Sequence, residues 1–211
     1  VDTMTGRATK TGAFPDNEEF AGLYIPDVTA PGAPATPEEL FTDFIDGSLT
    51  GVVAFDAPKV CQDGSQLSGD ITYRLKVNGE ETHTGSVRAG KRNFEIELTL
   101  PENGYYTFSL TLENASGKSF PTSLREYMGQ DAPSACTEAV ATNSDRGGTV
   151  SLKWRKPRGS MHGGYVDFPN ITYDVVRLPD NVAVASALTD TVFTDHIEDT
   201  ALKCYRYMIT P

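Results

Sequence analysis

The sequence contains few of the side chains that usually carry catalysis. Its 211 residues include three histidines, His83, His162 and His196, and three cysteines. A serine hydrolase needs a nucleophile, a base and a third group that orients the base. The sequence holds no Gly-x-Ser-x-Gly turn, no His-Glu-x-x-His pair and no glycine-rich phosphate loop. We therefore expect a protein that is not an enzyme, with no catalytic residue and no cofactor.

Acidic turns are the only candidates for a metal site. Asp63 and Asp70 flank a short polar loop, and a second acidic group lies near residue 195. Calcium prefers oxygen ligands, but it is usually held by a loop of defined spacing, and neither group matches one. We expect solvated turns here rather than bound metal. The residues of the second group are Asp190, Asp195, His196, Glu198 and Asp199.

The best candidate for ligand binding is the segment GSMHGGYVDFP, residues 159–169. It carries more bulky side chains than a plain connection needs, and loops at one pole of a β-sandwich commonly recognise ligands. The alternative is structural: Tyr165 and Phe168 would cover the mouth of the sandwich, with Leu67 in the corresponding place of an internal repeat. The candidate ligand-contact residues are Met161, His162, Tyr165, Asp167 and Phe168.

Apolar and polar residues alternate along most of the chain, which is typical of β-strands. Glycine, proline, asparagine and aspartate separate the alternating runs. Only one segment, PEELFTDF near 37–44, is compatible with a helical turn. The pattern predicts an all-β protein with strands at 50–55, 71–77, 94–100, 105–112, 149–154, 171–177 and 204–209.

The chain also repeats itself, with residues 51–80 resembling residues 150–181. Aromatic positions recur about 99 residues apart, and the triplet Ile-Thr-Tyr at 71–73 returns at 171–173. Two copies of one domain explain this spacing. The remaining pairs are Phe55 with Trp154, Pro58 with Pro157, Phe94 with Phe193, Tyr106 with Tyr205, and Phe108 with Tyr207.

The repeat unit resembles a known fold. An aromatic residue a few positions before a proline, a tyrosine-containing strand, and a Tyr-x-aromatic strand closed by Asn114-x-x-Gly117 are similar to the fibronectin type III domain. The phrase HGGYVDFPNITYDVVRLPD resembles repeats of large secreted or surface-anchored bacterial proteins. The resemblance implies two tandem immunoglobulin-like (fibronectin type III) antiparallel β-sandwiches. It also implies that Tyr106 and Tyr205 bond back to nearby backbone as tyrosine corners.

We expect three parts: a linker or arm at 1–30, a first domain at 31–131 and a second domain at 132–211. The junction at 128–135 is short and contains a proline, so limited swing is expected. A final strand near 120–128 closes the first domain, whereas the second reaches the equivalent of Leu112 at Pro211. The second domain is therefore expected to lack its last strand and the chain to be a fragment. The segment 18–28 is one candidate to cover the open edge.

Charge and hydropathy limit the partners. With 18 basic and 29 acidic residues the net charge is −11, which excludes nucleic acid as an expected partner. No apolar stretch reaches the roughly 18 residues of a membrane span. We expect an extracellular or cell-surface, non-catalytic module for adhesion, for binding a glycan or protein ligand, or for spacing other domains of the same polypeptide. The alternative is an accessory segment of a secreted polysaccharide- or protein-degrading enzyme.

The three cysteines are expected to be free thiols. Cys61 belongs to the first domain, whereas Cys136 and Cys204 lie at opposite ends of the second. A sandwich is about 30 Å long, while the Cα atoms of a disulfide lie within about 7 Å of each other. Titration under denaturing, non-reducing conditions should give three thiols per chain, and a single thiol would contradict this.

Overall fold

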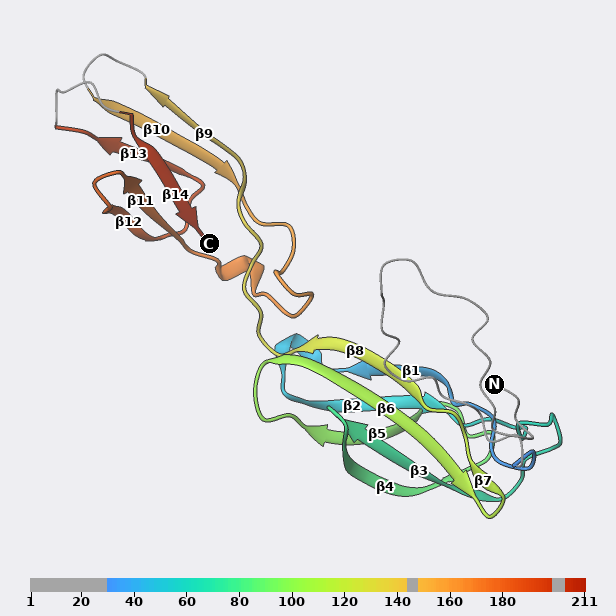
Figure 1. Cartoon of the computed structure of the whole chain (residues 1–211). Helices are drawn as coiled ribbons and strands as arrows, with labels where there is room; N and C mark the ends of the chain where they lie inside the picture. The colour runs from blue at the N-terminus through green and yellow to red at the C-terminus, as the bar shows by residue number, and fades with distance from the viewer. Residues whose placement is uncertain (1–29, 144–147, 199–203) are drawn as a thin grey trace, which may run out of the picture.

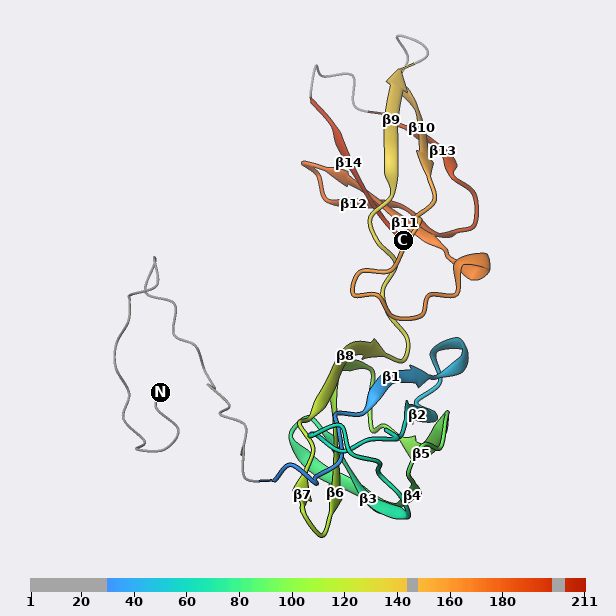
Figure 2. The same ribbon diagram turned by 90° about the vertical axis from the view of Figure 1, so that its right-hand side faces the viewer.

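The structure is a computed structural model that describes residues 30–143, 148–198 and 204–211. Two β-sandwiches follow one another along the chain and lie end to end (Figure 1, Figure 2). The expected arm at 1–30, apart from Ala30, and the segment 18–28 lie outside the described residues. In the described part, no helix has the length and apolar character needed to cross a membrane.

The first sandwich consists of two antiparallel sheets. One sheet has the strand order β1-β2-β5, and the other has β4-β3-β6, with β7 and β8 both pairing along β6. A short 3-10 turn, η2 (Ile45–Gly47), follows β1. The strands are β1 (Glu38–Asp43), β2 (Thr50–Asp56), β3 (Asp70–Val77), β4 (Glu80–Arg88), β5 (Phe94–Thr99), β6 (Gly104–Asn114), β7 (Gly117–Lys118) and β8 (Thr122–Met128).

Alternation along these strands builds the first core. Phe55 on β2 and Phe108 on β6 are 0% exposed, because successive strand residues face opposite sides and these two face inward. The tyrosine corner expected at Tyr106 is present: its hydroxyl donates to the Glu102 carbonyl at 2.8 Å. Asn114 closes the turn after β6 by accepting from the Ser116 and Gly117 amides.

The segment near 37–44, the only one compatible with a helical turn in the sequence, forms a strand instead. Residues 38–43 form strand β1, which pairs antiparallel with β2 and carries a register irregularity between Glu38 and Phe41. Local helix propensity is a weak preference, and pairing with a buried strand overrides it.

The second sandwich repeats the first with two strands fewer among the described residues, since it has no counterpart of β7 or β8 there. Its sheets have the orders β13-β10-β9 and β12-β11-β14. A 3-10 turn, η3 (Phe168–Asn170), precedes β11. The strands are β9 (Thr137–Asn143), β10 (Thr149–Arg155), β11 (Tyr173–Leu178), β12 (Val182–Leu188), β13 (Val192–His196) and β14 (Arg206–Thr210).

The sheet registers confirm most of the repeat. Val77 lies opposite Phe108, and their expected counterparts Arg177 and Tyr207 lie opposite each other. The predicted pairing of Phe94 with Phe193 as equivalent repeat positions is wrong, because the two residues differ by two positions in the sheet register. Phe94 lies opposite Phe55, whereas Phe193 lies opposite Leu152 rather than Trp154.

The aromatic cores agree with expectation at four of six positions. Phe55, Phe108, Trp154 and Tyr173 are buried. Tyr73 and Tyr207 were also expected in the cores, but each is half-buried. The Tyr73 hydroxyl lies over Gly85 of β4, so this ring reaches the edge of the sheet. The Tyr207 hydroxyl turns away from the apolar core toward a carboxylate.

The three cysteines are free; Cys61 is buried, Cys136 is half-buried and Cys204 is exposed. Cys136 immediately precedes β9, and burial raises the pKa of its thiol. The count of three titratable thiols stays a prediction for the denatured chain.

Two buried polar atoms of the second core, Trp154 Nε1 and the Tyr173 hydroxyl, have no hydrogen-bond partner in the described structure. An unsatisfied buried group costs about 1–3 kcal/mol. We expect Tyr173→Phe to raise the free energy of unfolding by about 1 kcal/mol. Trp154, the only tryptophan, reports this transition by fluorescence in urea.

Tyr106→Phe is the matched control, because the Tyr106 hydroxyl is hydrogen-bonded. Loss of this hydrogen bond is expected to lower the free energy of unfolding of the first sandwich by about 1 kcal/mol. Circular dichroism measures that unfolding. Destabilisation by Tyr173→Phe would show that its hydroxyl has a partner in solution.

Candidate functional site

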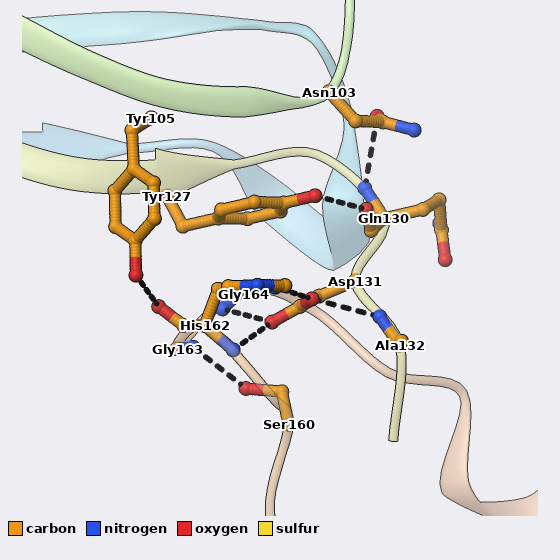
Figure 3. Close-up of polar contacts among 10 residues, drawn as sticks. All are labelled: Asn103, Tyr105, Tyr127, Gln130, Asp131, Ala132, Ser160, His162, Gly163 and Gly164. Atoms are coloured by element: carbon orange, nitrogen blue, oxygen red, sulfur yellow. Dashed lines mark hydrogen bonds and ion pairs between the residues drawn. The ribbon is translucent and has the colours of Figure 1, made fainter. Parts of the chain in front are cut away.

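The candidate loop lies where the two sandwiches meet. The linker 129–134 runs beside residues 159–165 and bonds to them through the backbone. Pro133 and Ser160 form an isolated antiparallel bridge. The Met161 amide donates to the Ala132 carbonyl at 2.8 Å. We call the linker 129–134, the loop 159–165 and the first-sandwich residues that contact them the joint (Figure 3).

Asp131 is the centre of the joint. Its side chain is 1% exposed. One carboxylate oxygen accepts from the His162 amide at 2.7 Å and the Gly164 amide at 3.1 Å. The other accepts from its neighbour, the Ala132 amide, at 2.8 Å and from His162 Nδ1 at 2.7 Å (Figure 3). One carboxylate therefore fixes the linker, the loop backbone and the imidazole together.

These contacts determine the protonation of Asp131. Burial alone would raise the pKa of this carboxyl group. The hydrogen bonds from the His162 side chain and from the backbone amides of His162, Gly164 and Ala132 outweigh burial and lower the pKa to about 2. A carboxylate that accepts several hydrogen bonds favours its ionised form. At neutral pH Asp131 is therefore an acceptor, and His162 Nδ1 is the donor.

His162 connects the loop to the first sandwich. Its ring stacks on Tyr127 of β8, with centroids 5.1 Å apart and planes 12° apart. Tyr105 of β6 meets the imidazole edge-on at 5.9 Å, and its hydroxyl donates to the His162 carbonyl at 3.2 Å. The Arg125 guanidinium lies 4.1 Å from the Tyr105 ring centroid. The loop is thus attached through both ring contacts and hydrogen bonds.

Close approach at the joint requires two glycines. A Cβ at Gly164 would lie 2.4 Å from Cδ1 of Tyr127. Gly47, in the turn after β1, has φ +72°, and a Cβ there would lie 2.9 Å from Cδ1 of Tyr165. Tyr165 therefore contacts the first sandwich on the side of η2, and His162 on the side of β6 and β8.

The backbone contacts between linker and loop, which we call the loop frame, also occur at the far end of the first sandwich. There the Gln62 amide donates to the Ala33 carbonyl, and Pro34 bridges Cys61, each 99 residues before its counterpart in the joint. Two chemical groups differ between the copies. Gly32 stands where Asp131 stands, and Asp63 stands where His162 stands. The loop frame therefore belongs to the repeat, whereas the carboxylate and imidazole belong to the joint.

The other loop candidates lie in different surroundings. Met161 is 63% exposed and Phe168 is 37% exposed. The Asp167 carboxylate accepts from Asn170. Tyr165 contacts the neighbouring sandwich rather than covering the mouth of its own, and the position matching Leu67 is the buried Val166. The structure brings His162 and Tyr165 to the joint and leaves Met161, Asp167 and Phe168 exposed to solvent.

Two of the candidate metal ligands, Asp63 and Asp195, have other partners. Asp63 accepts from the Ser65 amide and hydroxyl, which lowers the pKa of its carboxyl group. Asp195 points inward and is 5% exposed. Asp199 lies outside the described residues. Among the residues that are described, no three or more of the types His, Cys, Asp and Glu gather in a way that could hold a metal ion.

Asp195 belongs to a buried polar group that the sequence pattern did not indicate. It accepts from Arg177 Nη1 at 2.8 Å and from the Tyr207 hydroxyl at 2.8 Å. Hydrogen bonds to Asp180 and Asp195 raise the pKa of Arg177, and burial raises the pKa of Tyr207. In the first core the equivalent positions are apolar: Val77, Leu98 and Phe108. The signal in the sequence was this change of polarity between matched repeat positions.

The hydrogen-bonded pair of Asp131 and His162 is similar to the orienting acid and base of a catalytic triad, but no nucleophile stands beside the imidazole in the described structure. The Ser160 hydroxyl accepts from the Gly163 amide at 3.0 Å. In the described part of the chain, no hydroxyl is hydrogen-bonded to the His162 imidazole. The geometry supports attachment of two domains.

The fold and the joint define a tandem pair of all-β, fibronectin type III-like sandwiches. Sequence searches found no matching family and no matching curated protein. Similar solved structures include the FN1–FN3 domains of chicken CNTN1, with TM-score 0.34 and 12% identity over 85% of this chain and 57% of that one.

Two further structures are tandem arrays. The central fibronectin-III array of RIM-binding protein has TM-score 0.34 and 16% identity, covering 84% of this chain and 62% of that one. The two-domain fibronectin type III segment of chicken tenascin has TM-score 0.31 and 15% identity, covering 83% of each. This chain spans less than two thirds of the first two.

Proposed function

We propose that this chain is a non-catalytic module that fixes the spacing and orientation of domains in a larger secreted or surface-anchored bacterial protein. The observation that carries the proposal is the Asp131 carboxylate, which accepts three hydrogen bonds from His162 and Gly164 and so ties the linker to the loop of the second sandwich. The proposed location is extracellular or on the cell surface.

A short linker with a proline limits the swing of two domains but does not by itself fix their orientation. Here the backbone of 129–134 is bonded along the loop, and the His162 ring stacks on Tyr127 of the other sandwich. Reorientation would break these contacts together and would leave a buried carboxylate without its donors, which is costly. The exposed side chains of Met161, in the joint loop, and of Phe168, just after it, are the proposed contacts for a glycan or protein ligand.

The test is ¹⁵N relaxation of the full chain in solution. We expect one anisotropic rotational diffusion tensor to fit the amides of both sandwiches. His162→Ala should give separate tensors, whereas Phe168→Ala, an exposed residue of the same loop region, should keep one. Independent tumbling of the sandwiches in the unaltered chain would overturn the proposal.

A further inference from the structure

One sheet of each sandwich has the same place in the repeat. These sheets are β1-β2-β5 in the first sandwich and β13-β10-β9 in the second. Their central strands, β2 and β10, lie 99 positions apart in the sequence. Because side chains alternate along a strand, every second residue of these sheets points away from the core. The outward residues of the two sheets can therefore be compared position by position, and they differ in charge.

The outward face of β13-β10-β9 presents a lysine between two valines. Val140, Lys153 and Val192 lie opposite one another across the three strands. Val140 is 56% exposed, Val192 is 57% exposed, and Lys153 is exposed between them. Arg155, the next outward residue of β10, pairs with Glu138 at 2.7 Å. Lys153 has no ion-pair partner in the part of the chain that the structure describes.

The matching outward face of the first sandwich is acidic. Each of its two central rows ends in a glutamate on β5 and has a small or medium-sized apolar residue on β2. The rows are Phe41 with Ala54 and Glu95, and Asp43 with Val52 and Glu97. Among the described residues, no cation pairs with these three carboxylates, since Arg92 pairs with Asp56 and Glu39 instead.

The centre of the acidic face is low. Ala54 is the counterpart of Lys153, yet it has only a methyl group and is fully buried. Phe41, which lies opposite Ala54 on β1, is exposed. A long lysine side chain can lie along apolar surface while its ammonium group reaches a carboxylate. The first face thus has room, an aromatic ring and carboxylates where the second face has a lysine and valines.

The charge of the two sandwiches favours contact between unlike faces. Residues 30–131 carry 15 acidic and 8 basic side chains, whereas residues 132–211 carry nine and eight. Two copies of the first sandwich would repel each other, and the second sandwich is nearly neutral. Because the sandwiches of one chain lie end to end, the two faces of one chain do not meet (Figure 1, Figure 2). The partner that supplies the complementary face is a second copy of the chain.

We propose that the outward face of β1-β2-β5 docks on the outward face of β13-β10-β9 of a second copy. Lys153 of one copy lies over Ala54 of the other, with its ammonium group at Glu97. Val192 contacts Phe41 in the same interface. The apolar contacts supply attraction, and the charges determine which faces meet, because like-charged faces repel. Each face spans three short strands, so the contact belongs to the small, transient class of interfaces.

The test is analytical ultracentrifugation of the full chain at concentrations up to millimolar. We expect reversible association, either to a dimer that uses both contacts or to a longer array of copies. Lys153→Glu should weaken association at least about tenfold, because it places like charges opposite each other. Lys76→Glu is the matched control. It makes the same change of charge at an exposed lysine of β3, on the other sheet of the first sandwich, and should leave association unchanged.

A mixture of two variants identifies which faces meet. Glu97→Lys should weaken association as Lys153→Glu does, and both positions are exposed, so each variant should keep its fold. In an equal mixture each variant offers the charge that the other one needs, and association should return to the strength of the unaltered chain. A monomer at millimolar concentration would overturn the proposal. Association that survives Lys153→Glu, or that fails to return in the mixture, would overturn it too.

Discussion

Gly164→Ala is expected to separate the two sandwiches while leaving each one folded. The new methyl group would lie 2.4 Å from Cδ1 of Tyr127 and 2.9 Å from Cβ of Asp131. Neither atom can withdraw without opening the joint, because Asp131 is tied by hydrogen bonds and Tyr127 is stacked on His162. Forcing a methyl group into such a contact costs about 1–3 kcal/mol.

The measurement is ¹⁵N relaxation of both sandwiches, together with the amide shifts of His162 and Gly164. Separate rotational diffusion is expected in Gly164→Ala. Gly159→Ala is the matched control, since a Cβ at Gly159 would meet nothing within 4 Å. That variant should tumble as the unaltered chain does. If Gly164→Ala kept a single diffusion tensor, the close contact with Tyr127 would not hold the joint.

The strands that sequence analysis found are those that alternate strongly. β2, β3, β6 and β10 place large apolar side chains on one face, and their period of two is visible in the sequence. β4 (EETHTGSVR) and β9 (TEAVATN) were not predicted, because they are edge strands with little apolar content. Their pairing to central strands, rather than their own pattern, makes them strands.

Sequence analysis predicted the loop of the candidate site but not its partner in the linker. The bulky loop residues around His162 marked the loop, but its partner Asp131 lies in a linker that shows no periodic pattern. Only the fold brings these residues, 31 positions apart, into contact. A signal was present in the repeat: matched positions of the two loop frames hold Gly32 and Asp63 in one copy, and Asp131 and His162 in the other. A carboxylate and an imidazole introduced at neighbouring frame positions indicate a contact specific to that copy.

Acid is expected to release the joint, and Asp131 is the group that titrates. The hydrogen bonds hold the pKa of Asp131 at about 2 in the folded chain, against about 3.9 in a free peptide. Because the folded pKa is lowered, the ionised group stabilises the joint fully above the unfolded value. The contribution declines as pH falls below about 4 and is lost as pH passes through about 2.

The size of the effect follows from the shift. Each unit of pKa corresponds to about 1.36 kcal/mol, so the ionised Asp131 stabilises the joint by at most about 2–3 kcal/mol. The His162 side chain is 40% exposed, and solvent screening through it reduces this contribution to roughly 1–2 kcal/mol. The amide shifts of His162 and Gly164 should follow one acid transition, and the relaxation of the two sandwiches should separate over the same range.

Asp131→Asn isolates this group from the other carboxylates. It should loosen the joint at neutral pH, because the carboxamide is uncharged and accepts through one atom only, and it should remove the acid transition at Gly164. Asp63→Asn, at the matching frame of the first sandwich, is the control: Asp63 bonds to Ser65 rather than to another domain, so interdomain motion and its acid dependence should be unchanged. If Asp131→Asn retained the transition at Gly164, another carboxyl group would be responsible for the acid release.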